Sequence, residues 1–479
     1  MGKYKIQKKD MPHVVAGGMR EMINLAMPIV VSQACYTIMI FTDRLFLSRV
    51  GPNMMNATLG GGLSAFMMIT FFLGLTSYST ALVAQYLGSG QKNICATVVN
   101  QAVIIAVVAA PIIILCKPFA LFLFDKTGID NEQLIYQKIY FNILINGSVI
   151  VLVRNCFSSF FSGIGRTKTV MIAAATAMSV NICLNYVLIF GKFGVPALGI
   201  RGAAYGTVIG SMSALLVFIV SYFSKKNRIE YSMKKAKLFV WPIMKKLLKF
   251  GYPPGIEMFL NLLAFNCIVL IFHSKGLATA TASTIVFNWD LVAFLPLIGL
   301  EIAVTSLVGR YMGAGRPEIA ERSVSSGLKL GILYSIIILI FFVFFPGLLI
   351  NVFRPNGSQE AFMLAAPLAV FMVRMASLYV LVEAMIFIYV GALRGAGDTF
   401  WAMCYSVALH WILVPIIFVM MKVYGTTAET GWTTLVIIFM ISSVVVYMRY
   451  KEGKWKQLKV IQEPPTTIPP NAGQVAEDF

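Results

Sequence analysis

Residues 74–90 read G-L-T-S-Y-S-T-A-L-V-A-Q-Y-L-G-S-G, and residues 299–315 read G-L-E-I-A-V-T-S-L-V-G-R-Y-M-G-A-G. The two segments lie 225 positions apart, and 8 of their positions are identical. The same shift matches residues 28–90 to residues 253–315 without a gap, with 12 identities over 63 positions. Because the identities cluster at glycines with one constant spacing, the sequence predicts a duplicated membrane domain with function at the seam between its halves.

The composition indicates an integral membrane protein built from helices. The chain is 58% apolar and 12% charged, and its mean hydropathy is +0.80. Soluble chains carry about 25% charged residues, so this chain has too few charges to cover a water-exposed surface. The apolar runs are too long for transmembrane β-strands, and backbone groups in lipid must be bonded internally.

Twelve apolar runs are each near or above the roughly 20 residues that a helix needs to cross the hydrocarbon. The first six predicted spans are 22–47, 56–85, 93–117, 132–161, 168–190 and 200–223. The second six are 244–273, 279–311, 319–347, 360–392, 399–422 and 429–449. We therefore expect an N-terminal segment 1–21, an N-lobe 22–223, a basic linker 224–243, a C-lobe 244–449 and a disordered tail 450–479.

The net charge of +19 is concentrated beside the apolar runs, with nine Lys and Arg residues in 224–249. By the positive-inside rule, we expect a plasma-membrane protein with both termini in the cytoplasm. Contact with anionic lipid explains the charge, and no nucleic-acid binding is expected. Six spans per half is an even number, so the repeats are parallel and related by an axis along the membrane normal. Two six-helix lobes around a central cavity follow.

Prolines stand at twin positions near the start of the first span of each half. Pro28 and Pro253 each remove a backbone hydrogen bond and permit a kink. We interpret them as hinges that open one face of each lobe. The alternative is an ordinary proline of a membrane helix.

Ionisable side chains inside spans are costly, which makes them candidates for function. Asp43 lies towards the outer end of the first span, where a carboxylate facing the cavity binds a proton or a cation. The alternative is a structural pair with Arg44. Tyr379 and Glu383 lie four residues apart and so share one helix face. Glu383 is either a proton carrier or a Na⁺ ligand assisted by the tyrosine hydroxyl, and its alternative is an ion pair with Arg374.

Four further polar side chains form two sets by spacing. Glu257 and Asn261 lie four residues apart in the seventh span, and Glu257 is a third candidate for binding a proton or cation. Asp290 and Glu301 lie eleven residues apart in the eighth span, about three turns, so they share a face that lines the cavity. Their alternative is an ion pair with Arg310, His273 or Lys275.

The remaining polar residues of the spans suggest support for these acids. Arg154 and Arg374 are candidate counter-ions. Asn181 and Asn185 are four apart and form a polar network across the N-lobe, or else hold helices together.

No enzyme or metal site is apparent in the sequence. The three histidines, His13, His273 and His410, lie far apart, and the seven cysteines have no pairing pattern. No nucleotide-binding loop is present, so we expect no cofactor and an ion gradient as the energy source. The single metal site we consider is Na⁺ at Glu257, Glu383 and Tyr379.

Five motifs in order resemble the multidrug and toxic compound extrusion (MATE) family, and the NorM-like bacterial branch most. They are M-P-I-V-V-S-Q at 27–33, T-D-R at 42–44, V-A-Q-Y-L-G-S-G-Q at 83–91, N-I-C-L-N-Y-V-L-I-F-G-K-F-G-V-P at 181–196 and G-A-L-R-G-A-G-D-T at 391–399. The resemblance covers about residues 20–450. It implies a cation-coupled drug efflux antiporter with two lobes in a V shape.

The resemblance also assigns roles to single residues. Asp43 falls at the family's N-lobe aspartate, Pro28 at the proline where its first helix bends, and Asn181 in its N-lobe polar network. Tyr379 matches a tyrosine of the C-lobe.

Three positions depart from the family. Asn185 replaces an aspartate of some members, which puts a second N-lobe acid in doubt. Glu383 replaces an aspartate and keeps its charge. Asn261 occupies the place of a C-lobe glutamate, while Glu257 lies one turn earlier on the same face. That exchange either preserves the carboxylate or marks a different ion preference.

The sequence therefore predicts a monomeric antiporter that exchanges H⁺ or Na⁺ for amphipathic organic cations by alternating access. One alternative is a flippase for a lipid-linked or other amphipathic metabolite, which requires a strongly cationic cavity, whereas the acids dominate here. Another is a membrane-embedded transferase, which requires a cluster of catalytic or metal-binding side chains that the sequence lacks.

Overall fold

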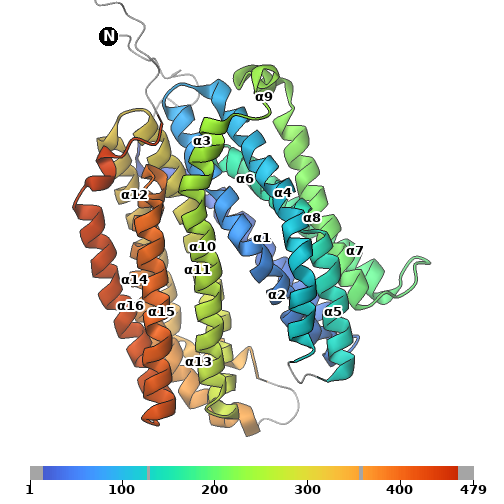
Figure 1. Ribbon diagram of the computed structural model, residues 1–479. Helices are drawn as coiled ribbons and strands as arrows, with labels where there is room; N and C mark the ends of the chain where they lie inside the picture. The colour runs from blue at the N-terminus through green and yellow to red at the C-terminus, as the bar shows by residue number, and fades with distance from the viewer. Residues whose placement is uncertain (1–14, 127–129, 355–359, 462–479) are drawn as a thin grey trace, which may run out of the picture.

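The computed structural model describes residues 15–126, 130–354 and 360–461, and these ranges contain helices and no β-strand (Figure 1). Eleven helices in them are long and apolar enough to cross a membrane, and a bent helix pair raises the number to twelve. This confirms the predicted all-helical architecture with twelve spans.

The first half contains eight helices that form six spans. They are α1 (Met19–Ser48), α2 (Pro52–Ser77), α3 (Ser79–Gly88), α4 (Lys92–Phe124), α5 (Asn131–Asn146), α6 (Ser148–Gly163), α7 (Thr167–Phe190) and α8 (Ile200–Tyr222). The second span is divided into α2 and α3 at Tyr78. The fourth is divided into α5 and α6, which meet at 48° around Gly147.

The linker and the second half contain the remaining helices. Their elements are α9 (Lys225–Glu230), η1 (Met233–Lys235), α10 (Trp241–His273), α11 (Leu277–Gly313), α12 (Pro317–Phe344), α13 (Pro346–Asn351), α14 (Glu360–Ala396), α15 (Thr399–Phe418), η2 (Val419–Val423), α16 (Ala428–Lys451) and η3 (Lys454–Gln457). The linker is therefore partly helical, and α10 begins three residues before the predicted span.

Two turns repeat the duplication in backbone detail. After α3, the amide of Gln91 donates to Tyr86 O at 2.9 Å, and after α11 the amide of Arg316 donates to Tyr311 O at 2.9 Å. Gly90 and Gly315 precede these amides with φ values of 80° and 66°. Only glycine adopts this left-handed conformation without steric cost, which explains the recurrence of glycine at this spacing.

The first helix of each half begins inside the core of the other half. Met22 and Leu25 of α1 belong to the hydrophobic core of the second half. In return, Ile243 and Leu247 of α10 belong to the core of the first half. The start of α1 thus packs in the second half and the start of α10 packs in the first half. The predicted lobes, 22–223 and 244–449, follow the order of the chain, but their first turns pack in the opposite lobe.

Glycines allow the two halves to touch backbone to backbone. A Cβ atom at Gly88 of α3 would lie 1.8 Å from Arg310 O, and a Cβ at Gly313 of α11 would lie 2.0 Å from Gln85 O. These two contacts are twins under the 225-residue shift, so α3 and α11 pack about a pseudo-two-fold axis. The helices converge near this seam and diverge towards the other end, which gives the V shape that the resemblance implies (Figure 1).

Replacing Gly88 with alanine is expected to weaken this seam. The added methyl group would overlap the Arg310 carbonyl, so α3 and α11 must move apart at a cost of about 1–3 kcal/mol. Thermal unfolding in detergent measures the effect as a lower midpoint. The control is Gly347→Ala, because a Cβ there meets no atom within 4 Å. Equal midpoints for the two variants would show that the contact is not required.

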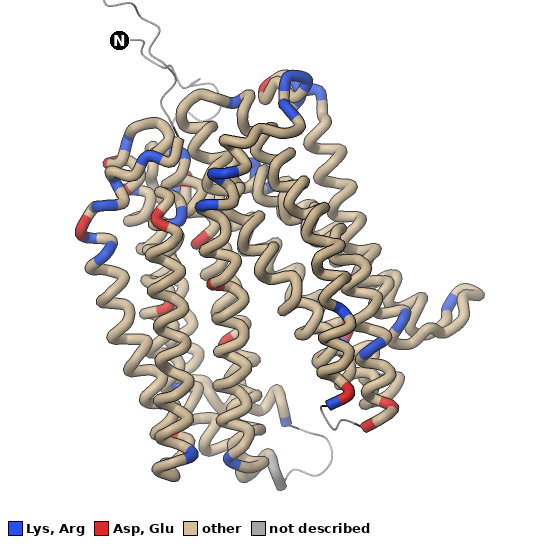
Figure 2. The backbone as a smooth tube through the Cα atoms, in the orientation of Figure 1, with Lys and Arg blue, Asp and Glu red and all other residues tan. Residues whose placement is uncertain are grey.

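One end of the molecule, here called the basic face, carries residues 15–18, the part of the linker that precedes α10 (224–240) and residues 452–461 (Figure 2). Lysine and arginine residues gather at this end. The linker is also tied to the turn before α7 by the ion pair between Arg166 and Glu230 at 2.5 Å. The basic linker therefore lies at the same end of the molecule as the residues that precede α1 and follow α16.

The chain after α16 is ordered up to residue 461, although the sequence predicted disorder from residue 450. Trp455 is fully buried, and its Nε1 donates to Tyr450 O at 2.9 Å. Val460 packs in the core of the first half. Composition indicated a polar tail, but these two apolar side chains suffice to fix its beginning. The rest of the predicted tail, 462–479, lies outside the described residues.

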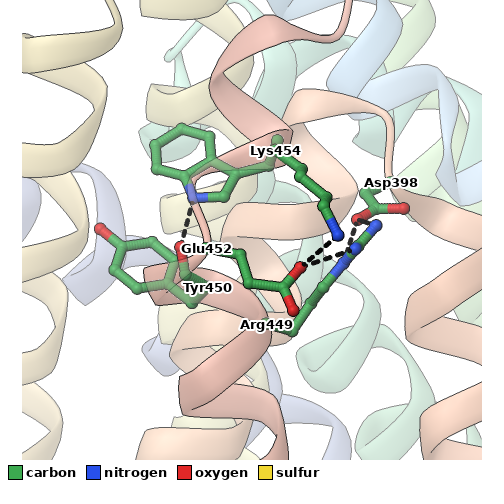
Figure 3. Close-up of polar contacts among 6 residues, drawn as sticks. Asp398, Arg449, Tyr450, Glu452 and Lys454 are labelled. Atoms are coloured by element: carbon green, nitrogen blue, oxygen red, sulfur yellow. Dashed lines mark hydrogen bonds and ion pairs between the residues drawn. The ribbon is translucent and has the colours of Figure 1, made fainter.

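Charged side chains hold the same segment in place (Figure 3). Arg449 donates from Nε and Nη2 to Asp398 Oδ2 at 3.0 and 2.7 Å. Glu452 lies between Arg449 at 3.1 Å and Lys454 at 3.0 Å. The hydrogen bond from Lys454 is the main reason that the pKa of Glu452 lies below its ordinary value.

Candidate functional site

Asp43 lies in a buried cluster of polar side chains in the first half, contributed by α1, α7 and α8. Its side chain is 5% exposed. Asn185 Nδ2 donates to Asp43 Oδ1, and Thr207 Oγ1 donates to Asp43 Oδ2 at 3.0 Å. The asparagine was a predicted member of this network. Thr207 was missed, although Gly206 beside it is a sequence signal of close helix approach.

The two predicted asparagines both belong to this cluster. Asn181 Nδ2 donates to Thr207 Oγ1 at 3.4 Å, and Asn185 Nδ2 also approaches Asn181 Oδ1 at 3.3 Å. A Cβ at Gly206 would lie 1.9 Å from Asn185 Oδ1, so a larger residue there would displace the Asn185 amide from this position. The network is therefore both interhelical and directed at the carboxylate.

Asp43 forms no ion pair with any residue in the described ranges. The alternative of an Asp43–Arg44 pair is thus not seen. Hydrogen bonds from neutral donors hold the carboxylate, and they stabilise its charge without cancelling it. Such a group can still accept a proton or a cation.

Three predicted residues meet in the second half. Tyr379 of α14 donates its hydroxyl hydrogen to Asp290 Oδ1 of α11. Glu383, one turn beyond Tyr379, is 8% exposed and interacts electrostatically with Asp290. Its Oε2 atom has no hydrogen-bond partner in the described structure. Asp290 and Glu383 are therefore two buried carboxyl groups whose charges interact, and the Tyr379 hydroxyl binds one of them, Asp290.

Aromatic rings surround this pair on one side. The ring centroid of Tyr379 lies 5.8 Å from that of Phe439 and 6.3 Å from that of Trp432. Trp432 is fully buried and donates to Met372 O at 3.0 Å. These contacts fix the tyrosine ring, and so they fix its hydroxyl against Asp290.

A second acidic cluster in this half contains an arginine that pairs with both of its carboxylates. Arg394 of α14 donates from Nη2 to Glu257 Oε1 of α10 at 2.7 Å and from Nη1 to Glu301 Oε1 of α11. Both carboxylates are buried. One guanidinium thus ties three helices together, in the geometry that its fork of donors favours.

The ion pairs place the predicted C-lobe acids in two groups. Glu257 does not join Glu383 and Tyr379, because its carboxylate is held by Arg394. Glu301 likewise pairs with Arg394 and separates from Asp290, although eleven residues place the two on one helix face. A shared face does not bring two side chains together when they lie three turns apart.

Asn261 binds a serine and not one of the predicted acids. Its Nδ2 donates to Ser406 Oγ of α15 at 2.7 Å, and His410 Nδ1 lies 2.8 Å from Ser406 O. This polar contact joins α10 to α15 and so positions two helices of the second half.

The predicted counter-ions are not partners of these acids. The Arg154 guanidinium lies 4.7 Å from the centroid of the Tyr36 ring, a cation–π contact. Neither Arg154 nor Arg374 forms an ion pair within the described ranges, and the alternative Glu383–Arg374 pair is absent there. Arg394 was missed because the sequence placed it in a loop.

No group of three or more His, Cys, Asp or Glu residues that could hold a metal ion occurs among the described residues. His13 lies outside them. The Na⁺ site predicted from Glu257, Glu383 and Tyr379 is not assembled, because Glu257 lies in the arginine cluster.

The helices continue through both predicted hinge prolines. Pro28 lies inside α1 and Pro253 inside α10. The Asn24 carbonyl lacks its helical donor because residue 28 is proline, and it accepts a hydrogen bond from Thr167 Oγ1 at 3.5 Å. Bending at these prolines stays a prediction.

The sequence matches a known family in both halves. The profile of the family described as MatE matches residues 28–187 and 253–419. A probable multidrug resistance protein NorM from Thermotoga maritima is 26% identical over 470 residues, which cover 96% of this chain and 97% of the relative.

Solved structures show the same fold. A MOP superfamily transporter from Pyrococcus furiosus, whose binding pocket is described as reversed in polarity, superposes with a TM-score of 0.83 at 18% identity over 92% of this chain and 96% of its own. An outward-facing multidrug resistance MATE family transporter superposes with a TM-score of 0.82 at 18% identity over 92% of this chain and 97% of its own. With the profile matching most of the chain, this protein belongs to the MatE family, as its resemblance to NorM-like proteins predicted.

Proposed function

We propose that this protein is a secondary active multidrug efflux transporter that exchanges H⁺ or Na⁺ for amphipathic organic cations. Members of its family are transporters and not enzymes, and the relative from Thermotoga maritima is named as a multidrug resistance protein. Export of drugs is therefore the activity that family membership favours most.

The observation that carries the mechanism is that each half holds buried carboxyl groups that form no ion pair with a described residue. Neutral donors hold Asp43 in the first half. In the second half the Tyr379 hydroxyl donates to Asp290, and Glu383 interacts with Asp290 through its charge. An ionised side chain in a span costs about 3 kcal/mol or more. Binding a proton, Na⁺ or a cationic substrate relieves this cost, which makes these groups sites of exchange.

The arginine cluster has a different role in this proposal. Arg394 forms an ion pair with each of Glu257 and Glu301, so each of these acids has less to gain from a further cation than an acid with no ion-pair partner. They hold α10, α11 and α14 in register and leave the exchange to Asp43, Asp290 and Glu383. Glu257 thereby changes from a predicted ion ligand to a structural residue.

Coupling follows from competition between the ion and the substrate. A ligand shifts a conformational equilibrium only by its differential affinity for the two states. We place the basic face in the cytoplasm of a plasma-membrane monomer, following the positive-inside rule. The α3–α11 seam lies towards this face and closes the space between the halves on that side. Ions therefore reach the carboxyl groups from the outside of the cell, and the substrate is released to the outside.

Transport in vesicles of purified protein tests the function. We expect a fluorescent organic cation to move against its own concentration gradient when the gradient of the coupling ion, H⁺ or Na⁺, is imposed. Without an ion gradient, no such movement is expected. Imposing the two gradients separately identifies the coupling ion. Vesicles without protein are the control. Movement at the control rate under both gradients would refute secondary active export.

A further inference from the structure

A groove of about 710 Å³ opens on the outside of the helix bundle between α2, α4 and the start of α10. Its walls are apolar, and its lining contains no Asp or Glu residue. Aromatic and aliphatic side chains, such as Phe72 of α2 and Val108 of α4, form most of its surface. It is separate from the carboxyl groups of the candidate site.

The rim of the groove is fixed by hydrogen bonds from α4 to the linker. Asn100 Nδ2 donates to Lys237 O at 3.0 Å, and Gln101 Nε2 donates to Leu238 O at 2.9 Å. Gln101 Oε1 also accepts from the backbone amide of Val240 at 3.2 Å. The linker is thus held against the first half, and Trp241, at the start of α10, is left 59% exposed at the rim.

Two lysines provide positive charge at the same end of the groove. Lys245 and Lys249 lie four residues apart on α10 and both line the groove. They lie on the order of 6 and 12 Å along the helix from Trp241, a depth from which lysines reach the lipid headgroups. Neither forms an ion pair with a residue of the described ranges. Lys249 Nζ does lie 5.5 Å from the centroid of the Phe250 ring, a contact that leaves its charge in place. The groove therefore combines apolar walls with two positive charges at one end that no described acid neutralises.

We infer that this groove binds one anionic phospholipid from the leaflet at the basic face. An acyl chain lies against Phe72 and Val108, and the phosphate contacts Lys245 and Lys249. Trp241 lies at the level of the headgroup, the usual depth of tryptophan in membrane proteins. Zwitterionic lipids offer the same chains but no net negative charge, so charge decides the preference.

The bound lipid contacts helices of both halves. α10 belongs to the second half, whereas α2 and α4 belong to the first. Beside the groove, a Cβ at Gly251 of α10 would lie 2.6 Å from Leu75 O of α2, so these helices are in backbone contact. An anionic lipid therefore stabilises the contact between the halves at this face.

The duplication does not provide a second site of this kind. Under the 225-residue shift, Lys245 corresponds to Arg20 and Lys249 to Asn24. The pair of positive charges is kept in only one half, so we expect one lipid per chain.

Fluorescence quenching by brominated lipids tests the inference on the full chain. The Trp241 signal is the difference between the protein and its Trp241→Phe variant. We expect dibrominated phosphatidylglycerol to quench this signal with an apparent affinity about tenfold higher than dibrominated phosphatidylcholine. Replacing Lys245 and Lys249 with glutamine is expected to remove the difference. Equal quenching by both lipids in the unsubstituted protein would by itself overturn the inference, whatever the lysine variants show.

A matched variant separates the groove from general surface charge. Replacing Lys234 and Lys235 with glutamine removes the same charge from exposed positions of the linker that do not line the groove. This variant is expected to retain the preference for phosphatidylglycerol. An equal loss in both double variants would show that the basic face attracts anionic lipid without a specific site.

Discussion

Replacing Asp43 with asparagine is expected to abolish gradient-driven export in a protein that still folds. The two side chains have nearly the same volume, and the carboxamide oxygen can still accept from Asn185 or Thr207. Asparagine cannot bind a proton or balance a cation in this cluster. We expect the initial export rate to fall at least about tenfold, which corresponds to a loss of about 1.4 kcal/mol or more in the coupling.

Asp125→Asn is the matched control for this variant. It makes the same change in an acid that lies outside the candidate site, where Asp125 pairs with Lys138. Export should be unchanged in the control, and both variants should elute as single species in detergent. Undiminished export by Asp43→Asn would remove the first half from the exchange mechanism.

Replacing Arg394 with methionine is expected to destabilise the protein more than any change at the carboxyl groups of the exchange mechanism. The substitution leaves Glu257 and Glu301 buried without a partner in the middle of three packed helices. Removing one member of a buried ionic cluster costs about 3–5 kcal/mol. The expected result is a large drop in the thermal unfolding midpoint, measured in detergent.

Neutralising both acids at the same time separates charge from packing. The triple variant Glu257→Gln, Glu301→Gln and Arg394→Met is expected to regain most of the lost stability, because no unpaired charge remains. It is also expected to export its substrate. A stable triple variant without export would show that Glu257 or Glu301 takes part in transport. An Arg394→Met variant as stable as the parent would contradict the structural role.

Much of the fold could be predicted because it depends on patterns along the chain. Apolar runs define the spans, and the glycines at 88, 90, 313 and 315 repeat because a tight turn and a backbone contact require them. The pairing of Asn181 with Asn185 on one helix face predicted their shared cluster. The broken fourth span at Gly147 was not predicted, since a single glycine in an apolar run does not specify a bend.

The grouping of acids in the second half could not be predicted, because it depends on which helices pack together. Glu257 and Glu383 both lie deep in spans, and the sequence alone does not distinguish a paired acid from an unpaired one. The deciding residue is Arg394, which lies in the last turn of α14, two residues beyond the predicted end of that span. Because the predicted span ended two residues too early, Arg394 was placed outside the membrane and its ion pairs with Glu257 and Glu301 were not expected.

The central claim is that ions and substrate compete for the buried carboxyl groups that form no ion pair with a described residue. Displacement of a bound fluorescent cation from purified protein measures this directly, as Na⁺ is added or the pH is lowered. We predict that the ion displaces the dye from the unsubstituted protein and that displacement is lost when Asp43→Asn is combined with Glu383→Gln. Displacement by the ion with an unchanged midpoint in the double variant would contradict the account.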